Sequence, residues 1–159
     1  EYLRKDEGMG RIGMSTVQHS PRLAGPDDVP GIAAVLNRWI DETTWMPRSM
    51  PPSDIEDIIR TALPDRIIWV LGDPIEAYLS LDPKVSKIGA LYCSRTGEGC
   101  GKALIDRAKE GRDFLWLHTN VPNLGAQRFY RREGFEPVGG EIMPDPPETV
   151  PEIRMEWHR

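Results

Sequence analysis

The chain has little cysteine, no long apolar run and no surplus of basic residues. Only Cys93 and Cys100 occur among its 159 residues, which excludes a disulfide framework. No apolar run approaches the roughly 20 residues that a membrane helix needs, and residues 1–5 are too polar for a signal peptide. The formal net charge of −5 argues against a general nucleic-acid binder. These absences predict a cytoplasmic protein that binds neither a membrane nor nucleic acid.

Metal and thiol chemistry also lack support in the sequence. The three histidines, His19, His118 and His158, show no metal-ligand spacing, so we expect no metal site. Cys93 and Cys100 form no Cys-x-x-Cys motif and are interpreted as small packing residues.

The length fits one domain. Residues 1–20 have no hydrophobic period, and the pattern sharpens after Pro26. We therefore expect an N-terminal extension or tag-like tail over residues 1–21, and a single domain over residues 22–159.

Hydrophobic periodicity predicts four helices and six strands in this domain. The helices are expected at 29–40, 55–63 (with Ser53 as its cap), 101–110 and 123–133, and the strands at 67–71, 75–81, 85–93, 114–117, 135–138 and 150–157. Two helices, three strands, a helix, a strand, a helix and two strands make a mixed α/β layer fold with mostly one sheet.

The strongest chemical signal is a glycine-rich turn between a strand and a helix. Gly97, Gly99 and Gly101 precede the helix, whose free N-terminal amides form an anion site. A nucleotide P-loop is disfavoured because Thr96 replaces its first glycine and Ala103 its Ser or Thr. The glycine spacing also departs from the dinucleotide fingerprint. An acyl-CoA pyrophosphate loop and a ligand-free connection both stay open on the turn alone.

A second motif follows downstream. Asn123, Ala126, Phe129, Tyr130, Gly134 and Phe135 form N-x-x-A-x-x-F-Y-x-x-x-G-F. Together with the glycine turn, this resembles the GNAT superfamily of acetyl-CoA-dependent N-acetyltransferases. The segments 39–40, 45–47 and 151–157 resemble a bacterial subgroup of small members. The resemblance covers about residues 22–157.

The resemblance implies a fold and a cofactor site. The fold is an α/β (α+β) architecture with a mixed, mostly antiparallel central sheet flanked by helices, and acyl-CoA binds at a splayed central strand pair. In the family, the strand matching Leu91 to Cys93 pairs with the pantetheine arm, and the glycines hold the pyrophosphate. The implied acetyl-CoA contacts are Leu91, Tyr92, Cys93, Arg95, Thr96, Gly97, Gly99, Cys100, Gly101, Lys102, Asn123, Ala126, Phe129 and Tyr130. Thr96 departs from the family's usual Gln or Arg, and the adjacent Arg95 is the expected substitute.

Charge is unevenly distributed along the chain. Residues 101–132 carry a net charge of +4, and the remainder carries −9. A basic zone in an acidic protein suits a polyanionic cofactor such as CoA. A solvated helix face with ordinary ion pairs would give the same count.

The resemblance favours a catalytic role for Tyr130. Tyr130 is the expected acid for the leaving thiolate, although packing beside Phe129 alone would also explain it. Glu76 is the expected general base because it lies on a predicted central strand, opposite in phase to Ile75 and Ala77, with a solvent-facing carboxylate as the alternative. His118 has a suitable pKa but is interpreted as a residue that ends a strand.

The expected reaction is direct attack by a primary amine on acetyl-CoA in a ternary complex. Acidic residues outnumber basic ones in 22–65 and in 133–159, which favours a cationic acceptor, either a small-molecule or a peptide amine. Asp41, Glu42 and Asp145 are expected at the acidic rim. Trp45 and Met46 are expected to line the acceptor pocket, unless they only anchor a loop. The alternative function is a non-catalytic acyl-CoA-binding or sensing module, and a homodimer stays open.

Overall fold

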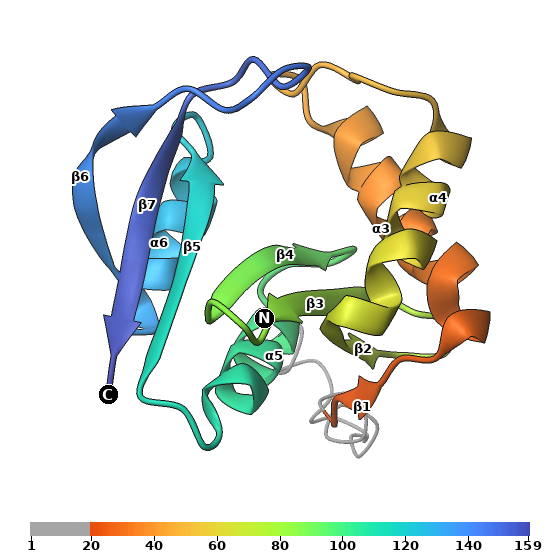
Figure 1. The fold of residues 1–159 in the computed structure, drawn as a ribbon, viewed down its shortest axis with the longest axis horizontal. Coiled ribbons are helices and arrows are strands. Elements are labelled where there is room, and N and C mark those ends of the chain that lie inside the picture. The colour runs from red at the N-terminus through yellow and green to blue at the C-terminus, as the bar shows by residue number, and fades with distance from the viewer. Residues whose placement is uncertain (1–19) are drawn as a thin grey trace, which may run out of the picture.

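The computed structural model describes residues 20–159. Most of the expected extension over residues 1–21 therefore lies outside the described residues. One seven-stranded sheet in the order β1-β2-β3-β4-β5-β7-β6 organises the rest (Figure 1). Of the described helices, none has the length and apolar character to cross a membrane.

The elements largely follow the predicted order. Their bounds are β1 Arg22–Leu23, η1 Pro26–Asp28, α3 Val29–Glu42, α4 Pro52–Ala62, η2 Leu63–Asp65, β2 Ile67–Leu71, β3 Ala77–Asp82, β4 Lys87–Cys93, α5 Cys100–Lys109, β5 Phe114–Asn120, α6 Leu124–Arg132, β6 Glu136–Ile142 and β7 Glu152–His158. The predicted mixed α/β fold with one mostly antiparallel sheet is confirmed.

Local boundaries required three corrections. Ser53 is not the cap of α4, because the helix begins at Pro52, where proline at the first position is favoured, and Pro51 is the N-cap. Glu76 precedes β3 instead of lying within it, because its amide donates to the Leu71 carbonyl across the β2–β3 turn at 2.8 Å. The short strand β1 was not predicted.

The two faces of the sheet carry different helices. In β2, Ile68 and Val70 pack with α3 and α4, whereas Trp69 and Leu71 pack with α5. This alternation is the two-residue period of a strand covered on both faces. On the other half of the sheet, α6 lies behind β5 and β7 as viewed in Figure 1.

The central strands β4 and β5 form a fork. They are parallel, and they pair only through Lys87 with Trp116 and Ile88 with Leu117, although each strand has seven residues. Beyond these pairs, β4 is hydrogen-bonded only to β3, and β5 only to β7, among the described strands. The splayed central pair expected from the GNAT resemblance is therefore present.

Candidate active site

A cleft of about 620 Å³ occupies the fork between β4 and β5. Its walls come from β4, the glycine turn, the start of α5, the end of β5 and one side of α6. All fourteen residues predicted to contact acetyl-CoA line it. Glu76, Trp45 and Met46 are not among its lining residues. The volume lies within the range typical of ligand pockets, about 300–1,000 Å³.

The glycine turn opens the N-terminus of α5 toward the cleft. Gly97 and Gly99 have φ angles of 77° and 86°, which lie in the left-handed region that favours glycine. Gly99 is the N-cap of α5, and no described side chain caps it. The first amides of the helix, with the positive end of its dipole, therefore face the cleft ready for an anion.

Gly101 permits the close packing of α5 on α6. A Cβ at this position would lie 3.0 Å from Cζ of Phe129. Phe129 also lies next to Tyr130, with ring centroids 5.3 Å apart. The glycine therefore sets how near the aromatic side of α6 comes to the glycine turn.

Two basic residues of the turn are held by carboxylates. Arg95 Nη2 donates to Glu76 Oε1 at 2.7 Å, and its Nε lies 3.7 Å from Glu98 Oε1. Lys102 Nζ lies 3.3 Å from Glu133 Oε1 and 3.4 Å from Asp106 Oδ2. Both cations line the cleft, which suits a pyrophosphate near the glycine turn.

α6 brings Asn123 and Tyr130 to the cleft. Asn123 is the N-cap, and its Oδ1 accepts a hydrogen bond from the Ala126 amide at 3.1 Å. Tyr130 is only 8% exposed, and no hydrogen bond from its hydroxyl is present among the described residues. Burial raises the pKa of Tyr130 well above that of an ordinary phenol. The side chain is therefore a protonated donor that faces the cleft.

Other groups in the cleft are also kept protonated. Burial raises the pKa of the Cys93 thiol to about 12, and the nearby Cys100 adds to the shift. Burial, with the charges of Glu148 and Glu152, raises the pKa of Tyr92 to about 12. At neutral pH these groups are neither nucleophiles nor proton acceptors.

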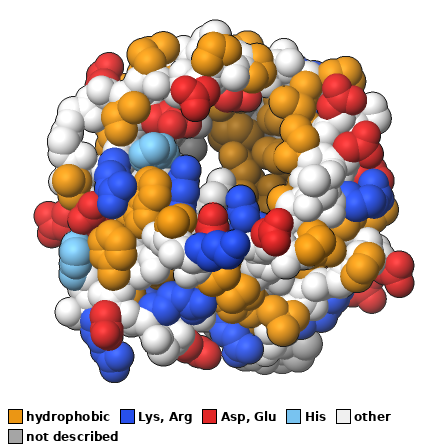
Figure 2. Space-filling view, in the orientation of Figure 1, with side chains coloured by type: hydrophobic (Ala, Val, Ile, Leu, Met, Phe, Trp, Pro, Cys, Tyr) orange, Lys and Arg blue, Asp and Glu red, His pale blue; other side chains and the backbone are white. Residues whose placement is uncertain are grey.

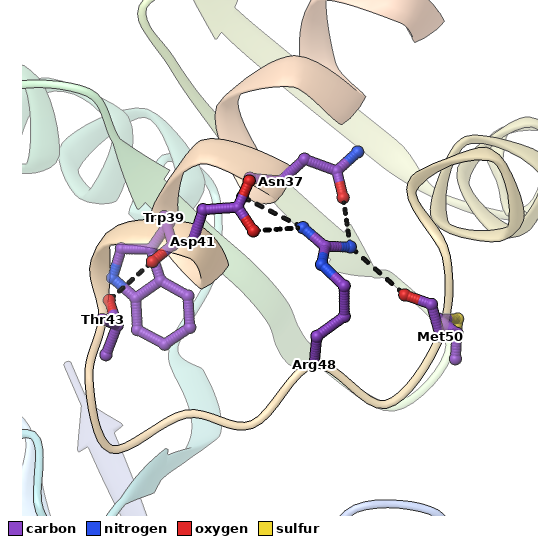
Figure 3. Close-up of polar contacts among 6 residues, drawn as sticks. All are labelled: Asn37, Trp39, Asp41, Thr43, Arg48 and Met50. Carbon is purple, nitrogen blue, oxygen red and sulfur yellow. Dashed lines mark hydrogen bonds and ion pairs between the residues drawn. The ribbon is translucent and has the colours of Figure 1, made fainter.

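The loop between α3 and α4, residues 43–51, follows the helix that carries Trp39 to the cleft, and Arg48 fixes its position (Figure 3). Its guanidinium donates to Asn37 Oδ1 at 2.8 Å, to Asp41 Oδ1 at 2.9 Å and to the Met50 carbonyl at 3.2 Å. The Thr43 hydroxyl donates to the Trp39 carbonyl at 2.6 Å. These bonds hold the loop against the end of α3.

Aromatic rings connect this loop to the cleft. Trp39 lines the cleft, and its ring lies 4.9 Å from that of Tyr92 and 5.7 Å from that of Trp45. Trp45 therefore supports Trp39 from behind. Met46 is half-buried in the same loop.

The loop also reaches the β6–β7 connection. Ser49 Oγ donates to Glu148 Oε2 at 2.9 Å, which joins residues from opposite ends of the chain. In Figure 1 these two connections meet above the fork. Figure 2 shows the hollow beneath them, with hydrophobic side chains inside and acidic side chains along its upper rim.

The acidic residues expected at the rim are partly engaged elsewhere. Asp41 pairs with Arg48 of the following loop, and Glu42 pairs with Arg38 of α3 at 3.1 Å, so both carboxylates have a cationic partner. The carboxylates whose charges act on Tyr92 are instead those of Glu148 and Glu152. The sequence shows the excess of acidic residues. It does not show which carboxylates are paired with arginines, because that depends on how the chain folds.

Eleven residues that line the cleft were not assigned to a site from sequence, and Trp39 and His118 are among them. Trp39 was interpreted as part of a helix face, and His118 as a strand end, yet both line the cleft. The signal for His118 was its position near the end of a predicted strand that precedes the Asn123 motif.

Among the described residues, no group of three or more His, Cys, Asp and Glu side chains is placed to hold a metal ion. No protein-family model matches the chain. The peptidyl-lysine N-acetyltransferase YjaB of Escherichia coli is 24% identical over 131 residues, covering 79% of this chain and 88% of that protein. The solution structure of apo YjaB has a TM-score of 0.71 at 23% identity and covers 87% of this chain and 96% of its own.

The chain has the fold of the GNAT N-acetyltransferases. A further neighbour is the acetyltransferase yncA of Salmonella typhimurium, whose structure includes acetyl-CoA. It has a TM-score of 0.63 at 17% identity, with 87% of this chain and 92% of that chain covered. The GNAT resemblance and fold are confirmed, and the predicted acyltransferase class and acetyl-CoA cofactor agree with these relatives.

Proposed function

We propose that this GNAT protein transfers the acetyl group of acetyl-CoA to a primary amine by direct attack in a ternary complex. The observation that carries the proposal is the β4–β5 fork, whose cleft is lined by all fourteen residues predicted to contact acetyl-CoA. The uncapped α5 N-terminus, with Arg95 and Lys102, fits a pyrophosphate there.

The donor supplies an activated thioester, and the protein supplies orientation and proton transfer. The β4 edge beyond Ile88 has no strand partner among the described residues, so its backbone groups are available to an extended pantetheine arm. Tyr130 donates a hydrogen bond to the departing sulfur. Glu76 acts through Arg95, holding the guanidinium beside the glycine turn.

Direct attack is favoured because the cleft thiols are protonated. A covalent acetyl-enzyme needs a thiolate, and the pKa of about 12 at Cys93 keeps the thiol neutral. Incubation of the protein with acetyl-CoA and no amine is expected to leave the intact mass unchanged. An acetyl adduct on Cys93 or Cys100 would show a ping-pong route instead.

A cationic acceptor is supported by the acidic rim. Glu148 and Glu152 act on Tyr92, and the rings of Trp39 and Tyr92 offer cation–π faces. YjaB is named as a peptidyl-lysine N-acetyltransferase, which is consistent with an amine on a flexible chain. A diamine such as 1,4-diaminobutane is expected to be a better acceptor than butylamine of equal length.

The decisive experiment combines binding and turnover. Calorimetric titration is expected to show binding of acetyl-CoA, with ATP and NAD as controls, and much weaker binding in Gly99→Glu. With an amine present, Tyr130→Phe should lower the rate of CoA thiol release about 100-fold or more, while acetyl-CoA affinity stays unchanged. Binding without turnover against any amine would favour the non-catalytic sensing module.

A further inference from the structure

The proposed transfer requires a group that accepts a proton from the amine. A primary ammonium has a pKa of about 10.4 and cannot attack until it is deprotonated. Glu76, the base expected from sequence, is paired with Arg95 and does not line the cleft. The structure must therefore provide the proton acceptor elsewhere.

Few titratable side chains of the described residues line the cleft. They are Tyr92, Cys93, Arg95, Cys100, Lys102, His118, Tyr130, Arg132 and Glu133. The phenols and thiols keep their protons, because burial raises the pKa of each. The arginines and Lys102 are cations, and Glu133 is bound to Lys102 at the end of α6. The imidazole of His118 is the remaining group suited to accept a proton near neutral pH.

His118 stands where the fork opens. It follows Leu117, which makes the last β4–β5 pair with Ile88. Leu117 and Thr119 are buried, so the two-residue alternation of β5 points His118 to the opposite face. That is the face on which α3 and α4 cover the other half of the sheet, and on which the acidic rim lies.

Glu152 orients the imidazole from the neighbouring strand. Nδ1 of His118 lies 3.3 Å from Glu152 Oε1 on β7. The negative charge beside Nδ1 favours the tautomer with the proton on Nδ1, and the lone pair is then on Nε2. A carboxylate that fixes the tautomer in this way leaves the other ring nitrogen ready to accept a proton.

The surrounding charges keep His118 neutral. Burial, Lys87 on β4 and Arg154 on β7 lower the pKa of His118 below its ordinary 6.5, and Glu152 on β7 opposes them. At pH 7 the ring is therefore unprotonated.

We propose that His118 is the general base of acetyl transfer, oriented by Glu152 across the β5–β7 pair; this rests on the proposed function. Nε2 takes one proton from the acceptor ammonium, and the freed nitrogen forms its bond to the acetyl carbon as the carbon–sulfur bond breaks. The departing sulfur takes the proton of the Tyr130 hydroxyl. The Tyr130 phenolate then takes a proton from the newly acetylated nitrogen, which leaves a neutral amide. His118 then returns its proton to water.

His118→Gln tests the assignment, with CoA thiol release measured from acetyl-CoA and 1,4-diaminobutane. We expect turnover at pH 7 to fall about 100-fold or more, with unchanged acetyl-CoA affinity by calorimetry. His158→Gln is the matched control, because His158 also contacts a glutamate, Glu156 Oε1 at 3.0 Å, but does not line the cleft. It should retain wild-type turnover.

The pH profile separates a base from a structural residue. In the wild type, kcat/KM should fall below the pKa of His118, as the ring gains a proton. Glu152→Gln removes a charge that raises this pKa, so the acid limb should move to lower pH. Free imidazole should restore part of the turnover of His118→Ala.

The outcomes distinguish the two proposals. Wild-type turnover and an unchanged acid limb in His118→Gln would overturn the assignment of His118 and leave the transferase intact. Acetyl-CoA binding with no thiol release for any amine would remove the proposed function, and this inference with it. If His118→Gln does not fold, the acid limb of Glu152→Gln decides, because an unmoved limb also contradicts the assignment.

Discussion

Tyr130 combines deep burial with a hydroxyl that has no hydrogen-bond partner among the described residues. An unpaired buried polar group typically costs about 1–3 kcal/mol. The side chain lines the cleft, so a bound donor offers the partner that the protein does not. The cost is consistent with a site built for a ligand more than for stability.

Gly99 shows how one residue combines folding and binding. Its φ of 86° places it in the left-handed region, where a Cβ costs about 1–2 kcal/mol. Gly99→Ala is expected to destabilise the protein by that amount in urea unfolding and to weaken acetyl-CoA binding. Gly140→Ala is the control: its φ is not in that region, and a Cβ there meets nothing within 4 Å. Equal stability of the two variants would contradict the prediction.

At the scale of elements, the loop between α3 and α4 depends on Arg48. Its guanidinium bonds to Asn37, Asp41 and Met50, and the same loop carries Trp45 and Ser49. Arg48 therefore fixes the loop that packs Trp45 against Trp39, the α3 residue that lines the cleft.

Arg48→Ala is expected to raise the KM for the amine several-fold and to leave acetyl-CoA affinity unchanged, because the loop lies away from the glycine turn. Steady-state kinetics and calorimetry measure the two effects. Arg38→Ala is the control: its exposed i,i+4 pair with Glu42 is worth only about 0.3–0.5 kcal/mol. A larger effect in Arg38→Ala than in Arg48→Ala would contradict the role of the loop.

At the scale of the whole molecule, the sheet has two halves joined at the fork. The half with β2 to β4 packs on α3, α4 and α5, and the half with β5 to β7 packs on α6. Only two residue pairs connect β4 to β5, and the cleft opens directly beyond them.

Leu117→Ala should therefore weaken the joint between the halves. Leu117 is 1% exposed at the last pair of the fork, and truncating a buried leucine costs about 2–5 kcal/mol. Thermal unfolding should show this loss. Leu124→Ala, at a leucine that is 60% exposed, should change stability by less than about 0.5 kcal/mol. Similar melting temperatures for the two variants would refute the argument.

The sequence by itself determined the main helices and strands apart from β1, their order, and the residues of the glycine turn and the Asn123 motif, because helical and strand periods and glycine requirements are local. The tertiary structure decided which carboxylates are paired with arginines. Glu76 pairs with Arg95 because the β3–β4 hairpin brings the residues that flank it together, and Asp41 pairs with Arg48 because the α3–α4 loop folds back on α3. It also brought Trp39 and His118 to one cleft. The pairing of β4, β5 and β7 in the sheet places these two residues at the same cleft. This pairing joins distant parts of the chain, so no local sequence pattern encodes it.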